Sequence, residues 1–252
     1  MKPDIIVSWP DNCDYPLWRQ FIRDNRDRFA NVIIVVTKAH ALDDYSEMIR
    51  WAMIIDNCAI FESPQVKSGE DWRNVAVNAG LAVSNAEWVW FTEQDFFVTP
   101  DFWGEVQKLE SDSDVISVDI TGRLHPCCIF VKRSIIEKTH KNFGIVPDRL
   151  DNFGVFQEDI KNSGARMMYV PQEYWHHMNG LSHNFRLMSE GGRPNYNEKE
   201  FIDYLRMCKN VTVMQDKIYN IKVDAYLAGI GAVEHSPTTP PPVKIPPVEA
   251  NK

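Results

Sequence analysis

The sequence predicts one α/β domain built on a mostly parallel central sheet. Short apolar runs without polar alternation are typical of strands that are covered on both faces. Between these runs lie segments whose apolar residues recur at helical spacing. Strand and helix alternate in this way through about residue 92, which is the pattern of βαβ units. The chain has 252 residues, enough to bury the core of one large domain.

The first half is expected to hold the regular part of this sheet. We expect strands at residues 5–7, 32–36, 58–61 and 88–91, and helices at residues 15–29, 45–53 and 72–83. Open α/β sheets bind ligands at the carboxyl ends of their strands. The sequence therefore predicts a binding half at about residues 1–98.

The second half, at about residues 99–233, is mixed and is expected to carry the acceptor and catalytic side. We expect helices at 100–109, 155–162 and 197–207, strands at 115–120, 127–131 and 167–170, and an ambiguous last element at 222–230. Residues 234–252 contain six of the 15 prolines and no aromatic residue. Such a segment does not pack a core, so we expect an extended or disordered tail.

Composition excludes several classes of protein. Lys and Arg number 27 against 35 Asp and Glu, a net charge of −8, so no general basic surface attracts nucleic acid or anionic lipid. The five cysteines are odd in number and form no C-x-x-C pair, which predicts reduced thiols. We find no signal peptide and no apolar run of the roughly 20 residues that a membrane span needs. A soluble, cytoplasmic protein is expected.

An acidic turn follows the most apolar strand. Glu93-Gln94-Asp95 comes directly after Trp88-Val89-Trp90-Phe91-Thr92. Glu93 and Asp95 alternate along an extended chain and so point the same way. Such a carboxylate pair can hold a hard divalent cation and, through it, a diphosphate. The alternative is the start of a solvated loop that carries two acids by chance.

Two further clusters carry groups that can do chemistry. In Glu158-Asp159 one carboxylate could act as a general base, although acids early in a helix also favour its dipole. His176, His177 and His183 fall within nine residues, and imidazole is a common metal ligand. Adjacent residues of an extended segment face opposite sides, so only one of His176 and His177 is expected to reach a shared site.

The order of these motifs resembles that of the GT-A glycosyltransferases, most closely the family 2-like group, over residues 3–185. The motifs are Ser8-Trp9-Pro10, Asn78-x-Gly80-Leu81, Glu93-x-Asp95, Glu158-Asp159, Tyr169-Val170-Pro171 and His177-x-x-Gly180-x-Ser182. The resemblance implies a GT-A, Rossmann-like three-layer sandwich with a mostly parallel central sheet.

The resemblance also implies roles for the acidic and histidine residues. Asp95 matches the direct ligand of Mn²⁺ or Mg²⁺, and Glu93 replaces the first acid of the family's Asp-x-Asp motif. His177 matches the histidine that approaches the metal or the diphosphate. Asp159 matches the catalytic base, with Glu158 as its substitute.

Donor-binding residues are implied in the same way. Ser8, Trp9 and Pro10 end the first strand where the family cradles the nucleotide base. Arg73 lies where a basic side chain reaches the diphosphate, and Asn78 belongs to the same donor-binding set. The chain departs from the family after the second strand, where residues 37–40 contain no Asp, so the nucleotide is open.

These observations predict a metal-dependent, inverting transferase. It would move a sugar from a nucleotide-sugar, with UDP favoured, to a hydroxyl of a glycan, a protein or a modified nucleobase in DNA. One alternative is a nucleotidyltransferase, but no Gly-rich segment with a basic residue follows the first strand. Another is a nucleotide- or glycan-binding module without catalysis. The oligomeric state stays open.

Overall fold

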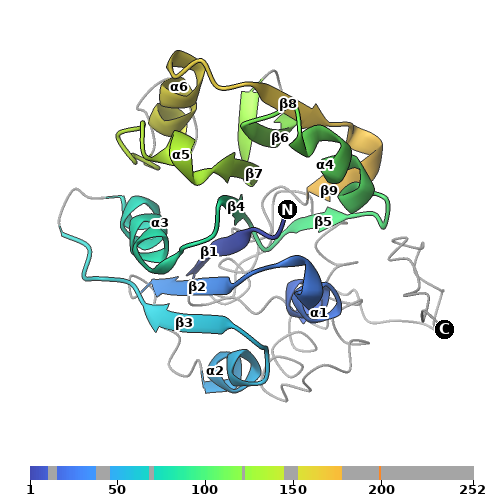
Figure 1. Ribbon diagram of the computed structural model, residues 1–252. Coiled ribbons are helices and arrows are strands. Elements are labelled where there is room, and N and C mark those ends of the chain that lie inside the picture. The colour runs from blue at the N-terminus through green and yellow to red at the C-terminus, as the bar shows by residue number, and fades with distance from the viewer. Residues whose placement is uncertain are drawn as a thin grey trace.

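A seven-stranded sheet lies between two layers of helices (Figure 1). The computed structural model describes residues 1–10, 16–37, 46–67, 71–120, 123–144, 153–177 and 199. The buried residues form two clusters, one on each face of the sheet. Helices α1, α2 and α4 contribute to one cluster, and α3, α5 and α6 to the other. The predicted α/β sandwich is confirmed.

The sheet has strand order β3-β2-β1-β4-β7-β6-β8. Its strands are β1 (Asp4–Pro10), β2 (Val32–Thr37), β3 (Cys58–Glu62), β4 (Trp88–Thr92), β6 (Val115–Ile120), β7 (Arg123–Lys132) and β8 (Met167–Val170). Strand β7 is antiparallel to both of its neighbours, and the other six strands run in one direction. A separate ribbon pairs β5 (Phe96–Val98) with β9 (Trp175–His177) in antiparallel orientation.

The helices connect the strands and cover the sheet. They are α1 (Pro16–Asp24), α2 (Ser46–Met53), α3 (Trp72–Val83), α4 (Phe102–Glu110), α5 (Arg133–Ile136) and α6 (Gly154–Asn162), with 3₁₀ turns at Arg26–Arg28 and Gln172–Tyr174. None of the helices in the described part of the chain is long and apolar enough to cross a membrane.

Most predicted elements are found, and three of them differ from the prediction by three residues or more at one boundary. The strand expected at 5–7 continues to Pro10 as β1. The helix expected at 15–29 ends at Asp24 and is followed by the 3₁₀ turn at Arg26–Arg28. At its end Asn25 donates its side-chain N–H to the Phe21 carbonyl, which satisfies one carbonyl of the last helical turn. The strand expected at 127–131 begins four residues earlier, at Arg123, as β7. The elements expected at 197–207 and 222–230, and the tail, fall outside the described ranges except for residue 199.

The three described cysteines, Cys58, Cys127 and Cys128, are free thiols, as the sequence predicts. Cys13 and Cys208 lie outside the described residues.

Trp90 is almost fully buried and stacks on Phe130 with ring centroids 4.8 Å apart. Trp90, in β4, therefore belongs to the core rather than to a binding surface.

Close approach of α3 to the sheet depends on Gly80. A Cβ atom built there would lie 2.6 Å from the Cγ2 of Ile6 and 3.4 Å from the Cγ2 of Val35. Both contacts involve buried, branched side chains that have little room to move. Glycine at this position lets the helix pack against β1 and β2.

Gly80→Ala is expected to lower the free energy of unfolding by about 1 to 3 kcal/mol through overpacking, measured by chemical denaturation. The matched control is Gly104→Ala in the exposed part of α4, where nothing lies within 4 Å of the added carbon. That change should instead raise stability by about 0.5 to 1 kcal/mol. Equal effects of the two substitutions would contradict this account of the α3 contact.

Candidate metal and donor site

The acidic turn lies where the strand order of the sheet reverses. Strand β1 has β2 on one side and β4 on the other, and Glu93, Gln94 and Asp95 directly follow β4. Gln94 donates its side-chain N–H to the Ser8 carbonyl at 2.8 Å. Thr92 donates its hydroxyl to the Cys127 carbonyl at 3.0 Å. These two bonds fix the turn to β1 and to β7.

His177 reaches the turn from β9. This strand pairs His177 with Phe96, the residue after Asp95. The His177 Nε2 lies 3.2 Å from the Glu93 Oε2 and 3.3 Å from the Asp95 Oδ1. The His177 side chain is 7% exposed and that of Asp95 10%, whereas Glu93 keeps 32%. The cluster is buried and opens to solvent through Glu93.

The charges of the cluster compensate one another. Burial favours the neutral form of each carboxyl, and for Asp95 it raises the pKa, with the Glu93 charge acting in the same direction. For Glu93 burial is outweighed by the contact with His177 and by the charges of His125 and Arg73, which together lower the pKa. Burial opposes the imidazolium of His177, but contacts with Asp95 and Glu93 raise its pKa to about 10. The carboxylates thus require a positive charge beside them.

These residues fit a divalent cation. Two carboxylates and one imidazole place ligand atoms within 4.8 Å of one another. Among the described residues, neither ring nitrogen of His177 has a partner at hydrogen-bonding geometry, although both are buried. A buried polar atom without a partner costs free energy, which a bound cation would recover. Oxygen ligands with one imidazole suit Mn²⁺, and Mg²⁺ takes the oxygens.

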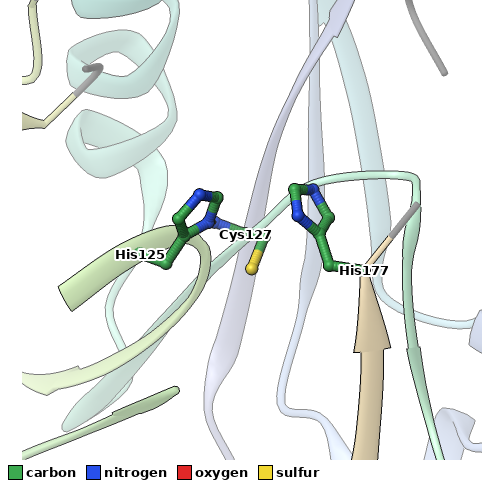
Figure 2. Close-up of side chains that lie close together, drawn as sticks. All are labelled: His125, Cys127 and His177. Carbon is green, nitrogen blue, oxygen red and sulfur yellow. The ribbon is translucent and has the colours of Figure 1, made fainter. Parts of the chain in front are cut away.

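His125 and Cys127 lie beside this cluster on β7 (Figure 2). The rings of His125 and His177 have centroids 4.9 Å apart. The Nδ1 of His125 accepts a hydrogen bond of 3.3 Å from the Cys127 backbone N–H. Neither residue is predicted as a ligand from the sequence, because Cys127 reads as part of an apolar run. The signal was the His-x-Cys spacing, which puts both side chains on one side of a strand.

Among the predicted donor-binding residues, Ser8 and Arg73 lie near the acidic turn. Ser8 is tied to it through Gln94, and the positive charge of Arg73 acts on Glu93. The Arg73 guanidinium also stands 4.5 Å from the centre of the Trp72 ring. Trp9 and Pro10 are extended and pair with β2. The structure therefore brings the end of β1 and the start of α3 to the turn.

Asn78 lies in α3 and makes local contacts. Its side-chain N–H groups donate to the Asn74 carbonyl at 2.9 Å and to the Lys141 carbonyl at 3.0 Å. Asn74 in turn accepts from the Phe143 backbone N–H at 2.9 Å. These bonds hold the segment after α5 against α3, which is a structural contribution of Asn78.

Glu158 and Asp159 are not brought to the cluster. Glu158 is exposed, and the Asp159 carboxylate accepts from the backbone N–H of His140 at 2.9 Å and contacts its Nδ1 at 3.0 Å. Asp159 lies near the end of α6 that leads into β8, and β8 starts at the amino-terminal edge of the sheet. Glu93 stands at the opposite, carboxyl-terminal edge. Figure 1 shows α6 in the same layer as α3, apart from β5 and β9.

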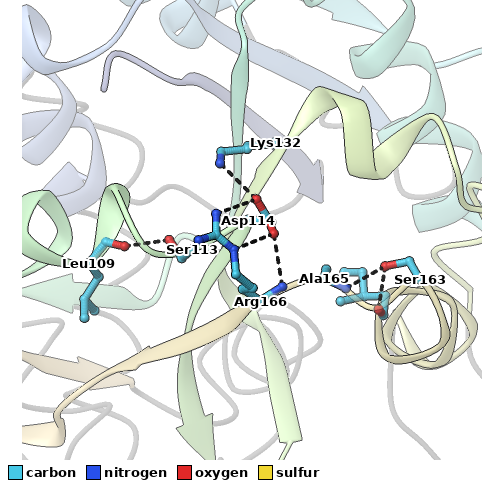
Figure 3. Close-up of polar contacts among 8 residues, drawn as sticks. Leu109, Ser113, Asp114, Lys132, Ser163, Ala165 and Arg166 are labelled. Atoms are coloured by element: carbon cyan, nitrogen blue, oxygen red, sulfur yellow. Dashed lines mark hydrogen bonds and ion pairs between the residues drawn. The ribbon is translucent and has the colours of Figure 1, made fainter.

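The strands that deliver His177 are held at their other end by Asp114 (Figure 3). Its carboxylate accepts from the Lys132 ammonium at 2.9 Å and from the Arg166 guanidinium at 3.2 Å. The Arg166 backbone N–H donates to the same group at 3.2 Å. Asp114 therefore joins the starts of β6 and β8 to the end of β7. Strand β9 follows β8 after one 3₁₀ turn, and Trp175 donates its indole N–H back to the Val170 carbonyl at 3.1 Å.

The comparisons with known proteins concern the fold. No family model and no curated protein matches the sequence. TarS of S. aureus has a TM-score of 0.50 and 15% identity, over 85% of this chain and 44% of that chain. The TarS 1-349 fragment in complex with UDP-GlcNAc has a TM-score of 0.48 and 13% identity, over 90% and 72%. HddC from Yersinia pseudotuberculosis has a TM-score of 0.45 and 11% identity, over 69% and 93%.

The likeness to TarS shows a GT-A-like fold, as the order of motifs predicts. This chain spans less than half of that TarS chain.

The Asp114 contacts predict a pH dependence of stability. The Arg166 and Lys132 side chains hold the pKa of Asp114 well below its usual range. A carboxyl with a depressed pKa stabilises the fold above its unfolded pKa of about 3.9, and this contribution is lost as the pH falls below that value. Asp114→Asn is expected to lower the free energy of unfolding at pH 7 by about 0.5 to 1 kcal/mol.

Chemical denaturation at pH 7 and pH 3 measures this effect. The difference between the wild type and Asp114→Asn should shrink at the lower pH. The matched control is Asp56→Asn, at an exposed position after α2, which should follow the wild type at both values. A difference that stays constant between the two pH values would contradict the role of the Asp114 charge.

Proposed function

We propose that the chain is a metal-dependent glycosyltransferase, which moves a sugar from a nucleotide-sugar to a hydroxyl acceptor. The observation that carries this proposal is the cluster of Glu93, Asp95 and His177 at the carboxyl end of β4. Open α/β sheets bind ligands at the point where their strand order reverses, and the cluster stands there. The GT-A-like fold supports the same conclusion.

The donor that we propose is a nucleoside diphosphate sugar, with UDP favoured on the family resemblance. A diphosphate needs positive charge in a site that already contains two carboxylates. Arg73 at the start of α3 supplies part of that charge from this chain. Asp95, Glu93 and His177 would hold the cation, Mn²⁺ or Mg²⁺. When bound, it would neutralise the charge that develops on the leaving diphosphate.

The chain's own contribution is a preorganised and largely dry site. Asp95 and His177 are nearly buried, and Gln94 and Thr92 fix the turn on both sides. Ligands held in this way need little rearrangement when charge develops, and low solvent exposure strengthens their interaction with it. Glu93 is the more exposed carboxylate, so the donor would enter on its side.

The reaction that we propose is a single displacement with inversion. The bond between the sugar carbon and the diphosphate oxygen breaks while the acceptor oxygen attacks from the opposite face. The acceptor proton goes to a general base. The sequence predicts Asp159 for this role, but the contact of Asp159 with His140, away from the cluster, argues against it. The proposed acceptor is a hydroxyl of a glycan or a protein, with a modified nucleobase in DNA less favoured because the net charge is −8.

Incubation with a panel of nucleotide-sugars and Mn²⁺ tests the proposal. Slow release of a nucleoside diphosphate from at least one donor is expected, because water can take the place of the acceptor hydroxyl. Asp95→Asn should abolish the release by removing a ligand charge, whereas Asp56→Asn should leave it unchanged. Absence of release and of thermal stabilisation by any nucleoside diphosphate in the panel would refute donor binding.

Asp159→Asn separates two roles of that carboxylate. A base predicts loss of turnover at an unchanged melting temperature. The contacts with His140 predict turnover that is retained and a loss of stability of about 1 kcal/mol, one hydrogen bond's contribution. We expect the second result, because His140 occupies the carboxylate. Loss of turnover in a variant that melts like the wild type would restore Asp159 as the base.

A further inference from the structure

Strand β7 adds ligands of a different chemical kind beside the cluster of Glu93, Asp95 and His177. His125 and Cys127 lie at its start, 7% and 0% exposed. In the described part of the seven-stranded sheet, β7 is the only antiparallel strand, so its first residues lie at the carboxyl end of β4. There the Glu93 backbone N–H donates to the Cys127 carbonyl at 3.4 Å. This topology puts the start of β7 beside the acidic turn.

The three groups converge on one point. Ring nitrogens of His125 and His177 and the sulfur of Cys127 all lie within 4.8 Å of one another. Figure 2 shows the sulfur between the two imidazole rings. The hydrogen bond from the Cys127 N–H to the His125 Nδ1 fixes the orientation of that ring.

A second observation points to a ligand at this place. Only 7% of the His177 side chain is exposed, and its Nδ1 has no hydrogen-bond partner among the described residues, while its Nε2 faces the Glu93 and Asp95 carboxylates. Its ring faces His125 at a centroid distance of 4.9 Å. The Nδ1 of this buried imidazole, which belongs to both ligand sets, is therefore not used by a protein hydrogen bond.

The chemistry of the donors selects the ion. Zn²⁺ and similar borderline ions are bound by thiolate and imidazole in a tetrahedral arrangement, whereas Mg²⁺ prefers oxygen ligands. Three protein ligands leave a fourth position for water or a substrate group. We propose that His125, Cys127 and His177 form a second ligand set, which binds a transition-metal ion of the Zn²⁺ class. This inference does not depend on the reaction proposed above.

Binding changes the state of the thiol. Burial raises the pKa of Cys127, and the nearby carboxylates of Glu93 and Asp95 act in the same direction. In the metal-free protein the group is thus a thiol. Coordination replaces the S–H bond by a bond from sulfur to the metal, and the proton passes to solvent.

The two ligand sets are coupled through His177. An ion on the nitrogen and sulfur atoms uses this imidazole, so an ion on Glu93 and Asp95 then has one ligand fewer. Five side chains thus form the two ligand sets, and His177 belongs to both of them. Zn²⁺ is expected to displace Mn²⁺ from the wild-type protein.

Titration of the full-length, metal-free protein with Co²⁺ tests the proposal. Co²⁺ takes the geometry of Zn²⁺ and shows a sulfur-to-metal charge-transfer band in the near ultraviolet when a thiolate binds it. The band is expected in the wild type and should disappear when Zn²⁺ is added. It should be lost in Cys127→Ser and kept in Cys128→Ser, since Cys128 is equally buried but belongs to neither ligand set.

Absence of the band in the folded wild type would overturn the proposal, as would its survival in Cys127→Ser. A second measurement needs no variant. Zinc-edge X-ray absorption of the wild type loaded with one equivalent of Zn²⁺ should show a sulfur neighbour at about 2.3 Å together with nitrogen neighbours. Only nitrogen and oxygen neighbours would exclude Cys127 as a ligand.

Discussion

Two carboxylates buried side by side need a positive charge, and the arrangement around the acidic turn meets that need. Glu93 and Asp95 follow a strand whose residues are all buried. Burying like charges together is unfavourable unless a counter-charge accompanies them. His177, which lies 82 positions after Asp95 in the sequence, supplies it at 3.3 Å. The ribbon of β5 and β9, which directly follows the acidic turn, brings the imidazole to the carboxylates.

The rest of the sheet keeps this small cluster in place. Gln94 ties the turn to β1, and Asp114 joins β6, β7 and β8 at the far edge of the sheet. Because β7 is antiparallel to β4, its first residues come to the carboxyl edge, where the parallel strands end. One reversed strand thus adds a second imidazole and a thiol to a cluster that otherwise contains two carboxylates and one imidazole. The geometry allows one site to discriminate between classes of metal ion.

Much of the fold and part of the site could be predicted from the sequence. Each element that could not be predicted has its own physical reason. Strands buried on both faces read as apolar runs, so β1 to β4 and the acidic turn after β4 were found. The strands β5 and β9 have three residues each, too few for a period to show. His125 and Cys127 act together only through the antiparallel pairing of β7, which no local pattern reveals. The Glu158-Asp159 pair shows the converse, since the motif is present but its helix places Asp159 beside His140.

The central claim is that Glu93, Asp95 and His177 hold a divalent cation next to the donor diphosphate. A crystal structure of the protein soaked with Mn²⁺ and UDP tests it most directly, through the anomalous scattering of manganese. The account predicts an anomalous peak in contact with these three side chains, with the diphosphate beside it at the carboxyl ends of β1 and β4. A UDP molecule bound elsewhere, or a peak that none of the three side chains contacts, would contradict it.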